Sequence, residues 1–178
     1  GNQSAIFEAS MGEVVAQSFR IEADLREALR QGALQLFLQP QLGADGTLYG
    51  AEVLLRWPHP TQGLVPPSLF IPIAEQSDLI VTLSEFTLVQ SCRILAQCSA
   101  EGFALHLSVN LSPRHFRRNT FTVWLKGVLA ETGADPTHLT LEVTEGLFID
   151  NLDEIAARMR ELSQLGIHFS IDDFGTGY

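Results

Sequence analysis

The chain has 178 residues and a mass of 19.6 kDa, which is enough to bury one sizeable core. It carries 21 acidic residues against 11 Lys and Arg residues, so its formal net charge is −10 at pH 7, and such a surface repels nucleic acid polymers unless it has a basic face. A small phosphate-bearing ligand is not excluded, because bound divalent cations can reverse the local field of a carboxylate-lined cleft.

The first strongly periodic segment follows a mixed, polar stretch over residues 1–18. Apolar residues recur at four-residue spacing over residues 21–29, and Gly32 follows them. This pattern predicts a helix that ends at the glycine. We predict that residues 1–18 form a linker or the end of an upstream domain, and that the main domain covers residues 19–178.

Two strands are predicted after this helix. Leucines alternate over residues 34–38, and an Asp-Gly turn signal at residues 45–46 leads into an apolar run over residues 48–57. A connection this short joins antiparallel strands. Prolines then interrupt residues 58–67, and the helical period is clearest over residues 88–95.

From residue 105 onward the pattern alternates between strand and helix. Strands are predicted at 105–111, 139–144 and 167–173, and helices near 119–132 and 151–165. This alternation is typical of a parallel sheet covered by helices, and therefore of an α/β fold.

The last predicted helix carries its own boundary signals. Asn151 and Glu154 have the spacing of a capping box, and Gly166 ends the helix. Four apolar residues at helical spacing are predicted to form its buried stripe: Leu152, Ile155, Met159 and Leu162.

The two cysteines, Cys92 and Cys98, lie six residues apart within one helical pattern. This spacing suits neither a disulfide framework nor a zinc site, so we predict reduced thiols in the core or in a groove. No apolar run of the roughly 18 residues of a membrane span is seen, and no secretory leader opens the sequence. We therefore expect a soluble, cytoplasmic domain, and leave open a membrane anchor elsewhere in a longer parent.

The predicted strands of the second half each have one apolar and one polar face, because side chains two residues apart share a face. The polar faces carry His106, Ser108 and Asn110, then Thr140, Glu142 and Thr144, then His168, Ser170 and Asp172. A doubly wound sheet needs two apolar faces, so a consistently polar face favours a barrel whose interior holds a site. We predict that His106 and His168 line this barrel through hydrogen bonds, with metal ligation as the alternative.

Asn110, Glu142 and Asp172 lie near the carboxyl ends of their strands, where barrel enzymes carry out their chemistry, and the hairpin strand adds Glu52. Acids that share a cavity resist ionisation unless cations are bound, and ligands that are all oxygen suit Mg²⁺ or Mn²⁺. The adjacent Asp173 can bring in a second ion, and two ions can support an in-line displacement at phosphorus. Taken singly, each acid is more often a structural or surface residue, but their shared parity favours one site.

Six motifs follow one another along the chain. They are Phe37-Leu38-Gln39-Pro40-Gln41, Gly50 to Trp57 with the triplet Glu52-Val53-Leu54, Phe70 to Glu75, Val109 to Pro113, Leu141 to Glu145, and Asp172 to Gly177. In this order they resemble the EAL domain family of cyclic di-GMP phosphodiesterases, from about residue 20 to the end. The resemblance implies a modified TIM (β/α)8 barrel whose first strand is antiparallel to the others, in agreement with the hairpin predicted above.

The resemblance also implies a set of site residues. It assigns the binding of two ions, Mg²⁺ or Mn²⁺, to Glu52, Asn110, Glu142, Asp172 and Asp173. Of these, Glu52, Asp172 and Asp173 are the implied catalytic acids.

The resemblance also implies which residues contact the substrate and which one supports the site. Gln39 and Arg56 would contact bound cyclic di-GMP, and Glu145 would brace the loop that begins at Asp173. The implied reaction is hydrolysis of cyclic di-GMP to linear pGpG by a metal-activated water. The implied partners are a second copy of the chain in a homodimer, and an upstream GGDEF or sensory domain in the parent.

Two departures from the family pattern bear on this expectation. The name-giving triplet has Val53 in place of alanine, and the sequence ends at Tyr178, before the family's catalytic Lys, its later Glu-bearing loop and the closing strands. We therefore expect an incomplete barrel that alone is inactive and either self-associates or borrows a wall from a partner. The alternative function for the parent is a cyclic di-GMP receptor without turnover.

Overall fold

The computed structural model describes residues 2–149 and 151–172. These residues fall into two compact units, each made from two stretches of the chain. The first unit comprises Gly1–Gln35 and Leu55–Ile80, and the second comprises Leu36–Leu54 and Val81–Tyr178. Strand β2 (Leu48–His59) and helix α3 (Leu79–Ala100) contribute to both units.

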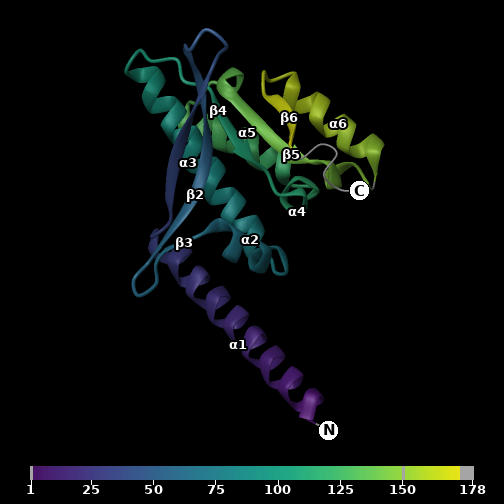
Figure 1. Ribbon diagram of the computed structural model, residues 1–178. Helices are drawn as coiled ribbons and strands as arrows, with labels where there is room; N and C mark the ends of the chain where they lie inside the picture. Colours follow the sequence, from purple (N-terminus) through teal and green to yellow (C-terminus); the bar gives the residue numbers. More distant parts are fainter. Residues whose placement is uncertain (1, 150, 173–178) are drawn as a thin grey trace. The chain divides into compact units, whose positions relative to one another are not determined.

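The strands form one mixed sheet in the order β1-β2-β4-β5-β6, and β3 pairs antiparallel with β2 (Figure 1). Besides β2, the strands are β1 (Gln35–Leu42), β3 (Gly63–Val65), β4 (Leu107–Asn110), β5 (Leu139–Thr144) and β6 (His168–Asp172). Strands β2, β4, β5 and β6 pair in parallel. The predicted α/β class is confirmed.

The hairpin between β1 and β2 is closed by the loop over residues 43–47. The backbone N–H of Gly43 donates to the carbonyl of Thr47 at 2.8 Å, and the Asp45 side chain accepts from the Thr47 N–H at 3.1 Å. Gly46 has φ of +79°, a conformation that glycine adopts without strain. A loop this short requires antiparallel strands, as predicted, so β1 runs against the parallel strands.

The first unit is built on helix α1 (Asn2–Gln31) and helix α2 (Pro67–Glu75). Helix α1 ends before Gly32, as predicted, but it begins far ahead of the first periodic residue, Ile21. Ile21 and Leu25 are buried, and Trp57 of β2 packs edge-on against Phe70 of α2 with ring centroids 5.6 Å apart. Strand β3 was not predicted, because it has only three residues and follows a proline-rich stretch.

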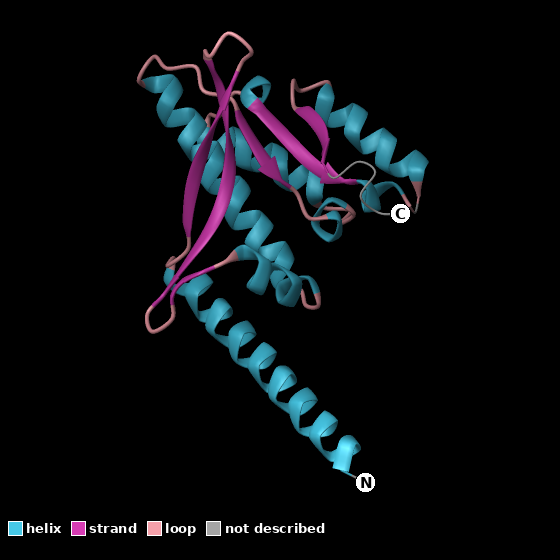
Figure 2. Ribbon diagram, viewed as in Figure 1, coloured by secondary structure: helices cyan, strands magenta, loops and turns pink. Residues whose placement is uncertain are grey.

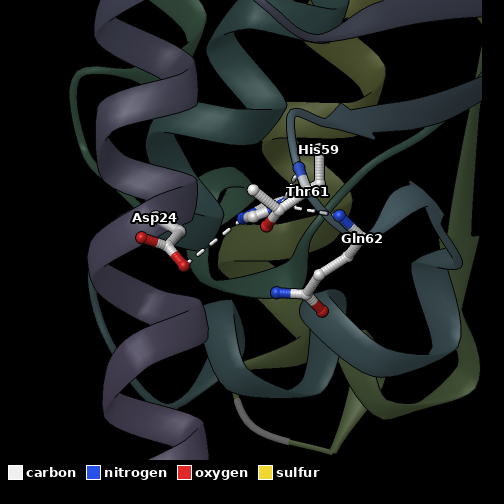
Figure 3. A network of polar contacts seen from close by, with 4 residues as sticks. All are labelled: Asp24, His59, Thr61 and Gln62. Atoms are coloured by element: carbon white, nitrogen blue, oxygen red, sulfur yellow. Dashed lines mark hydrogen bonds and ion pairs between the residues drawn. The ribbon is translucent and has the colours of Figure 1, made fainter.

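A histidine network within the first unit ties α1 to the turn between β2 and β3 (Figure 3). The Nδ1 atom of His59 accepts hydrogen bonds from the backbone N–H groups of Thr61 and Gln62, both at 3.2 Å. Its Nε2 atom lies 3.4 Å from Oδ2 of Asp24. Because Nδ1 accepts, the proton of the neutral ring is on Nε2 and points to the Asp24 carboxylate.

In the second unit, helices cover the apolar face of the strands (Figure 2). Besides part of α3, these are α4 (Pro113–Phe116), α5 (Phe121–Thr132) and α6 (Leu152–Ser163), with 3-10 turns η1 (Pro136–His138) and η2 (Glu145–Phe148). The core joins apolar strand residues such as Leu107 and Leu141 to helix residues such as Leu88 and Leu125. The predicted alternation is therefore confirmed for β4 and β5, whose apolar positions are buried.

The predicted start of α6 is wrong in two respects. Asn151 precedes the helix, but its φ of +57° is left-handed and its side chain makes no capping hydrogen bond. A capping side chain requires extended backbone at that position, so the capping box with Glu154 does not form. Leu152 is 61% exposed and lies outside the buried stripe, whereas Ile155 and Leu162 are buried as predicted.

Helix α3 has the length and composition of a membrane-spanning segment, which the sequence was not expected to contain. More than half of this stretch, 56%, is buried inside the protein. Cys92 is in the core, as predicted, and Cys98 is partly buried and packs against that core. Burial in the second unit accounts for the apolar character of the helix.

Candidate functional site

The polar face of the sheet brings together residues far apart in the sequence. Asn110 of β4 and Glu142 of β5 are paired directly in the parallel register. Glu52 of β2 pairs with Ser108, which lies two residues before Asn110 on the same face of β4. The structure therefore places three of the five predicted metal ligands at neighbouring positions of three adjacent strands.

A hydrogen bond joins two of these residues. Nδ2 of Asn110 donates to Oε1 of Glu52 at 3.0 Å. This bond limits the rotamers of both side chains. With its N–H group turned to Glu52, the amide of Asn110 keeps its carbonyl oxygen for another partner.

The remaining predicted ligands lie at and beyond the end of β6. The backbone position of Asp172 pairs with Thr144, two residues after Glu142 on β5. Asp173 lies outside the described residues. Asn110 thus lies two residues beyond the β4 partner of Glu52, and Asp172 lies two residues beyond the β6 partner of Glu142. Tilted strands produce a stagger of this kind.

The described side chains supply oxygen donors of the kind that bind divalent cations. Glu52 and Glu142 are half-buried and supply carboxylate oxygens, and Asn110 is exposed and supplies an amide oxygen. Oxygen ligands of this kind fit Mg²⁺ or Mn²⁺. Across residues 2–149 and 151–172, no three His, Cys, Asp or Glu side chains converge on a point that could hold a metal. The chemistry of the donors fits, and a complete ligand set needs more than the described side chains.

The residues predicted to contact the nucleotide and brace the site lie on several elements. Gln39 is exposed on β1, in the second unit, whereas Arg56 belongs to the part of β2 that lies in the first unit. The guanidinium of Arg56 donates to the carbonyl of Leu55 at 2.9 Å. Glu145 is half-buried and opens turn η2 directly after β5.

Val53, the departure from the Glu-Ala-Leu triplet, points away from this site. It is 3% exposed and belongs to the hydrophobic core of the second unit. Its neighbour Glu52 is on the opposite, polar face, because successive residues of a strand alternate. The substitution therefore changes core packing and leaves the acid in place.

A separate cavity of about 560 Å³ lies over the amino-terminal end of α6. Its lining shares no residue with the predicted ligand set and consists of Arg117, Asn119, Asn151, Glu154, Ile155 and Arg158. Arg158 donates to Glu154 at 3.1 Å and to the backbone carbonyl of Arg118 at 3.0 Å. Sequence reasoning did not find this cavity, because its two arginines lie in different elements with no shared period.

Comparison with known proteins places the chain in a family. The EAL domain model matches residues 22–178. The chain therefore belongs to the EAL domain family, as the motifs of the sequence predict.

Particular relatives can then be named. The chain is 38% identical to the oxygen sensor protein DosP of Escherichia coli K12, over all of this chain and 22% of DosP. It is 37% identical to the bifunctional diguanylate cyclase/cyclic di-GMP phosphodiesterase MucR of Pseudomonas aeruginosa, over 99% of this chain and 26% of MucR. The chain thus spans about a quarter of the length of these relatives.

The fold is also similar to that of a solved phosphodiesterase. The structure of the PaMucR phosphodiesterase in complex with c-di-GMP matches with a TM-score of 0.83 and 38% identity. The match covers 89% of this chain and 65% of that one. The polar positions of β2, β4 and β5 described above thus lie within a fold that this chain shares with the PaMucR phosphodiesterase.

Proposed function

We propose that the intact protein carrying this domain hydrolyses cyclic di-GMP to linear pGpG with Mg²⁺ or Mn²⁺ as cofactor. The observation that carries the proposal is the shared polar face on which Asn110 bonds Glu52 and pairs with Glu142, in a chain that belongs to the EAL family. Support comes from relatives named as cyclic di-GMP phosphodiesterases, among them NbdA of Pseudomonas aeruginosa and PdeR of Escherichia coli.

Five residues would hold the ions in this proposal: Glu52, Asn110, Glu142, Asp172 and Asp173. When bound, such ions lower the pKa of water and offset negative charge on phosphoryl oxygens. The acids supply the negative charge that attracts the cations, and without cations the same acids would repel the phosphates of the ligand.

The protein's own side chains position the parts of this site. Asn110 fixes the orientation of Glu52 through the hydrogen bond of 3.0 Å. Gln39 and Arg56 are proposed to orient the dinucleotide, Arg56 through its guanidinium group, which matches phosphate geometry. Glu145 is proposed to brace the loop that starts at Asp173.

The proposal has consequences for the architecture of the whole protein. The mixed sheet would be completed to a (β/α)8 barrel, in which the polar face is the interior. Residues 1–18 would link this domain to an upstream diguanylate cyclase or sensory domain, and the intact protein would act in the cytoplasm as a homodimer.

The test is turnover by the intact protein with either metal, followed by chromatographic separation of cyclic di-GMP from pGpG. Glu52→Gln and Glu142→Gln should each lower kcat by about 100-fold or more, since each removes a negatively charged ligand. Glu161→Gln is the matched control: Glu161 is an exposed acid paired with Lys126 at 2.7 Å, and its loss should leave kcat unchanged. A folded protein that binds cyclic di-GMP but yields no pGpG would refute the proposal and establish the receptor function instead.

A further inference from the structure

Three histidines lie on the polar face of the sheet, towards the amino-terminal ends of the parallel strands. His106 comes just before β4, His138 ends turn η1 just before β5, and His168 is the first residue of β6. Each precedes one of the proposed metal ligands by four residues: Asn110, Glu142 and Asp172. Alternation along β6 places His168 on the face of Asp172, at the opposite end of that strand.

The rings of two of these histidines are in contact. The centroids of His106 and His138 are 4.6 Å apart, with an interplanar angle of 62°. On its other side, His106 stacks on the ring of Tyr49 of β2, at 5.5 Å and 10°. The imidazole of His106 is therefore held between strand β2 and the segment that leads into β5.

The titratable groups facing His106 come from three elements. Tyr49 is on β2, Asp135 and His138 flank turn η1, and His168 is on β6. The pKa of His106 is lowered from its ordinary value, first by partial burial of the ring and then by the charges of His138 and His168, while Asp135 acts in the opposite direction.

Asp135 is the acid in this group, and its carboxylate is already engaged. Its Oδ1 accepts from the backbone N–H of Thr137 at 2.9 Å and from the hydroxyl of Thr137 at 2.7 Å. These bonds fix the carboxylate as the cap of turn η1. It thus offsets only part of the repulsion among imidazolium groups.

A metal does not explain the cluster in this arrangement. Within the described part of the chain, no three His, Cys, Asp or Glu side chains converge on a metal position. What the geometry does provide is close packing of the His106 and His138 rings, which are compatible when neutral and repel one another when both are protonated.

We propose that His106 and His138 form a proton-sensitive contact, which holds the start of β4 against the turn that leads into β5 at neutral pH and loosens when the imidazoles take up protons. The contact is sensitive to acidification because free histidine becomes protonated at about pH 6.5. It is independent of metal, of cyclic di-GMP and of the proposed hydrolysis.

The direction of the effect follows from proton linkage. In the unfolded chain, His106 has its ordinary pKa, and in the folded protein its pKa is lower. As the pH falls from the ordinary value towards the lowered one, the unfolded state binds more protons than the folded state. The free energy of unfolding therefore decreases on acidification through this window.

The proposal is tested by following the imidazole proton resonances of the intact protein by NMR as the pH is lowered. In His138→Gln and in His168→Gln, the titration midpoint of His106 should move up towards that of free histidine, because a neighbouring positive charge has been removed. In Asp135→Asn it should move further down, because an offsetting negative charge is lost.

His59→Gln is the matched control, since His59 belongs to the first unit and makes its contacts there. Its loss should leave the midpoint of His106 unchanged. The urea midpoint should also fall less between neutral and mildly acidic pH in His138→Gln than in the unmodified protein. The proposal is overturned if the midpoint of His106 is the same in His138→Gln, His168→Gln and the unmodified protein. The opposite shift expected for Asp135→Asn provides a second test should either glutamine variant fold poorly.

Discussion

Gly50 in β2 has no room for a side chain, and replacing it by alanine should destabilise the protein. A Cβ atom at this position would lie 2.6 Å from the carbonyl oxygen of His106 and 3.1 Å from its Cβ atom. The same carbonyl accepts a hydrogen bond of 2.8 Å from the N–H of Ala51, which holds β2 against β4. The oxygen belongs to the backbone, so the clash can be relieved only if the strands separate.

The cost of Gly50→Ala can be estimated from these contacts. Overpacking of one methyl group against backbone costs about 1–3 kcal/mol, and the weakened Ala51 bond adds about 1 kcal/mol. We therefore expect the free energy of unfolding to fall by about 2–4 kcal/mol. Separation of the two strands should also disturb Glu52, whose hydrogen bond to Asn110 crosses the same pair.

Urea unfolding, followed by circular dichroism, measures this change. Gly127→Ala is the matched control, because Gly127 lies within α5 and a Cβ atom there meets nothing within 4 Å. That variant should gain about 0.5–1 kcal/mol, since alanine favours a helix over glycine. If Gly50→Ala unfolds at the same urea concentration as the unmodified protein, the close approach of β2 to His106 is wrong.

Three further outcomes are expected. Val53→Ala, which restores the family triplet, should lower the free energy of unfolding by about 1–2 kcal/mol because core packing is lost. It should leave kcat per folded molecule unchanged, and a change in kcat above about twofold would place Val53 in the site. His59→Ala should lower the free energy of unfolding in urea by about 1–2 kcal/mol, because two backbone N–H groups lose their acceptor. Asp24→Ala should lower it by less than about 1 kcal/mol, because that acid is exposed. The reverse order would refute the role of the ring in the turn. Burial, and then the charge of Arg118, lowers the pKa of His115 to about 4, so stability is lost as the pH falls from about 6.5 to 4. Between pH 7 and 4.5, the free energy of unfolding measured in urea should therefore fall markedly less in His115→Gln than in the unmodified protein. An equal decrease in both proteins would contradict this.

The polar and apolar faces of the strands could be predicted because alternation is a local property of sequence. Leu107, Val109 and Leu141 are buried, while Asn110 lies on the other face, as expected. The order of motifs along the chain also identified the family, which the match over residues 22–178 confirms.

Other features depend on information that is not local. The bond between Glu52 and Asn110 joins residues 58 positions apart and needs the strand register, which sequence patterns leave open. The capping box failed because Asn151 adopts a left-handed backbone conformation that its residue type permits but does not require. Helix α1 extends ahead of Ile21 through residues whose mixed pattern gave no amphipathic signal.

The course of β2 through both units limits how the protein can be dissected or recombined. Each unit is assembled from two stretches of chain, and the change from one unit to the other falls between Leu54 and Leu55, inside a single strand. No continuous stretch of the sequence forms either unit alone, so a single crossover would not exchange one unit between two proteins. Loss of either unit would cut the strand that carries Glu52, and unfolding of the two should therefore be cooperative.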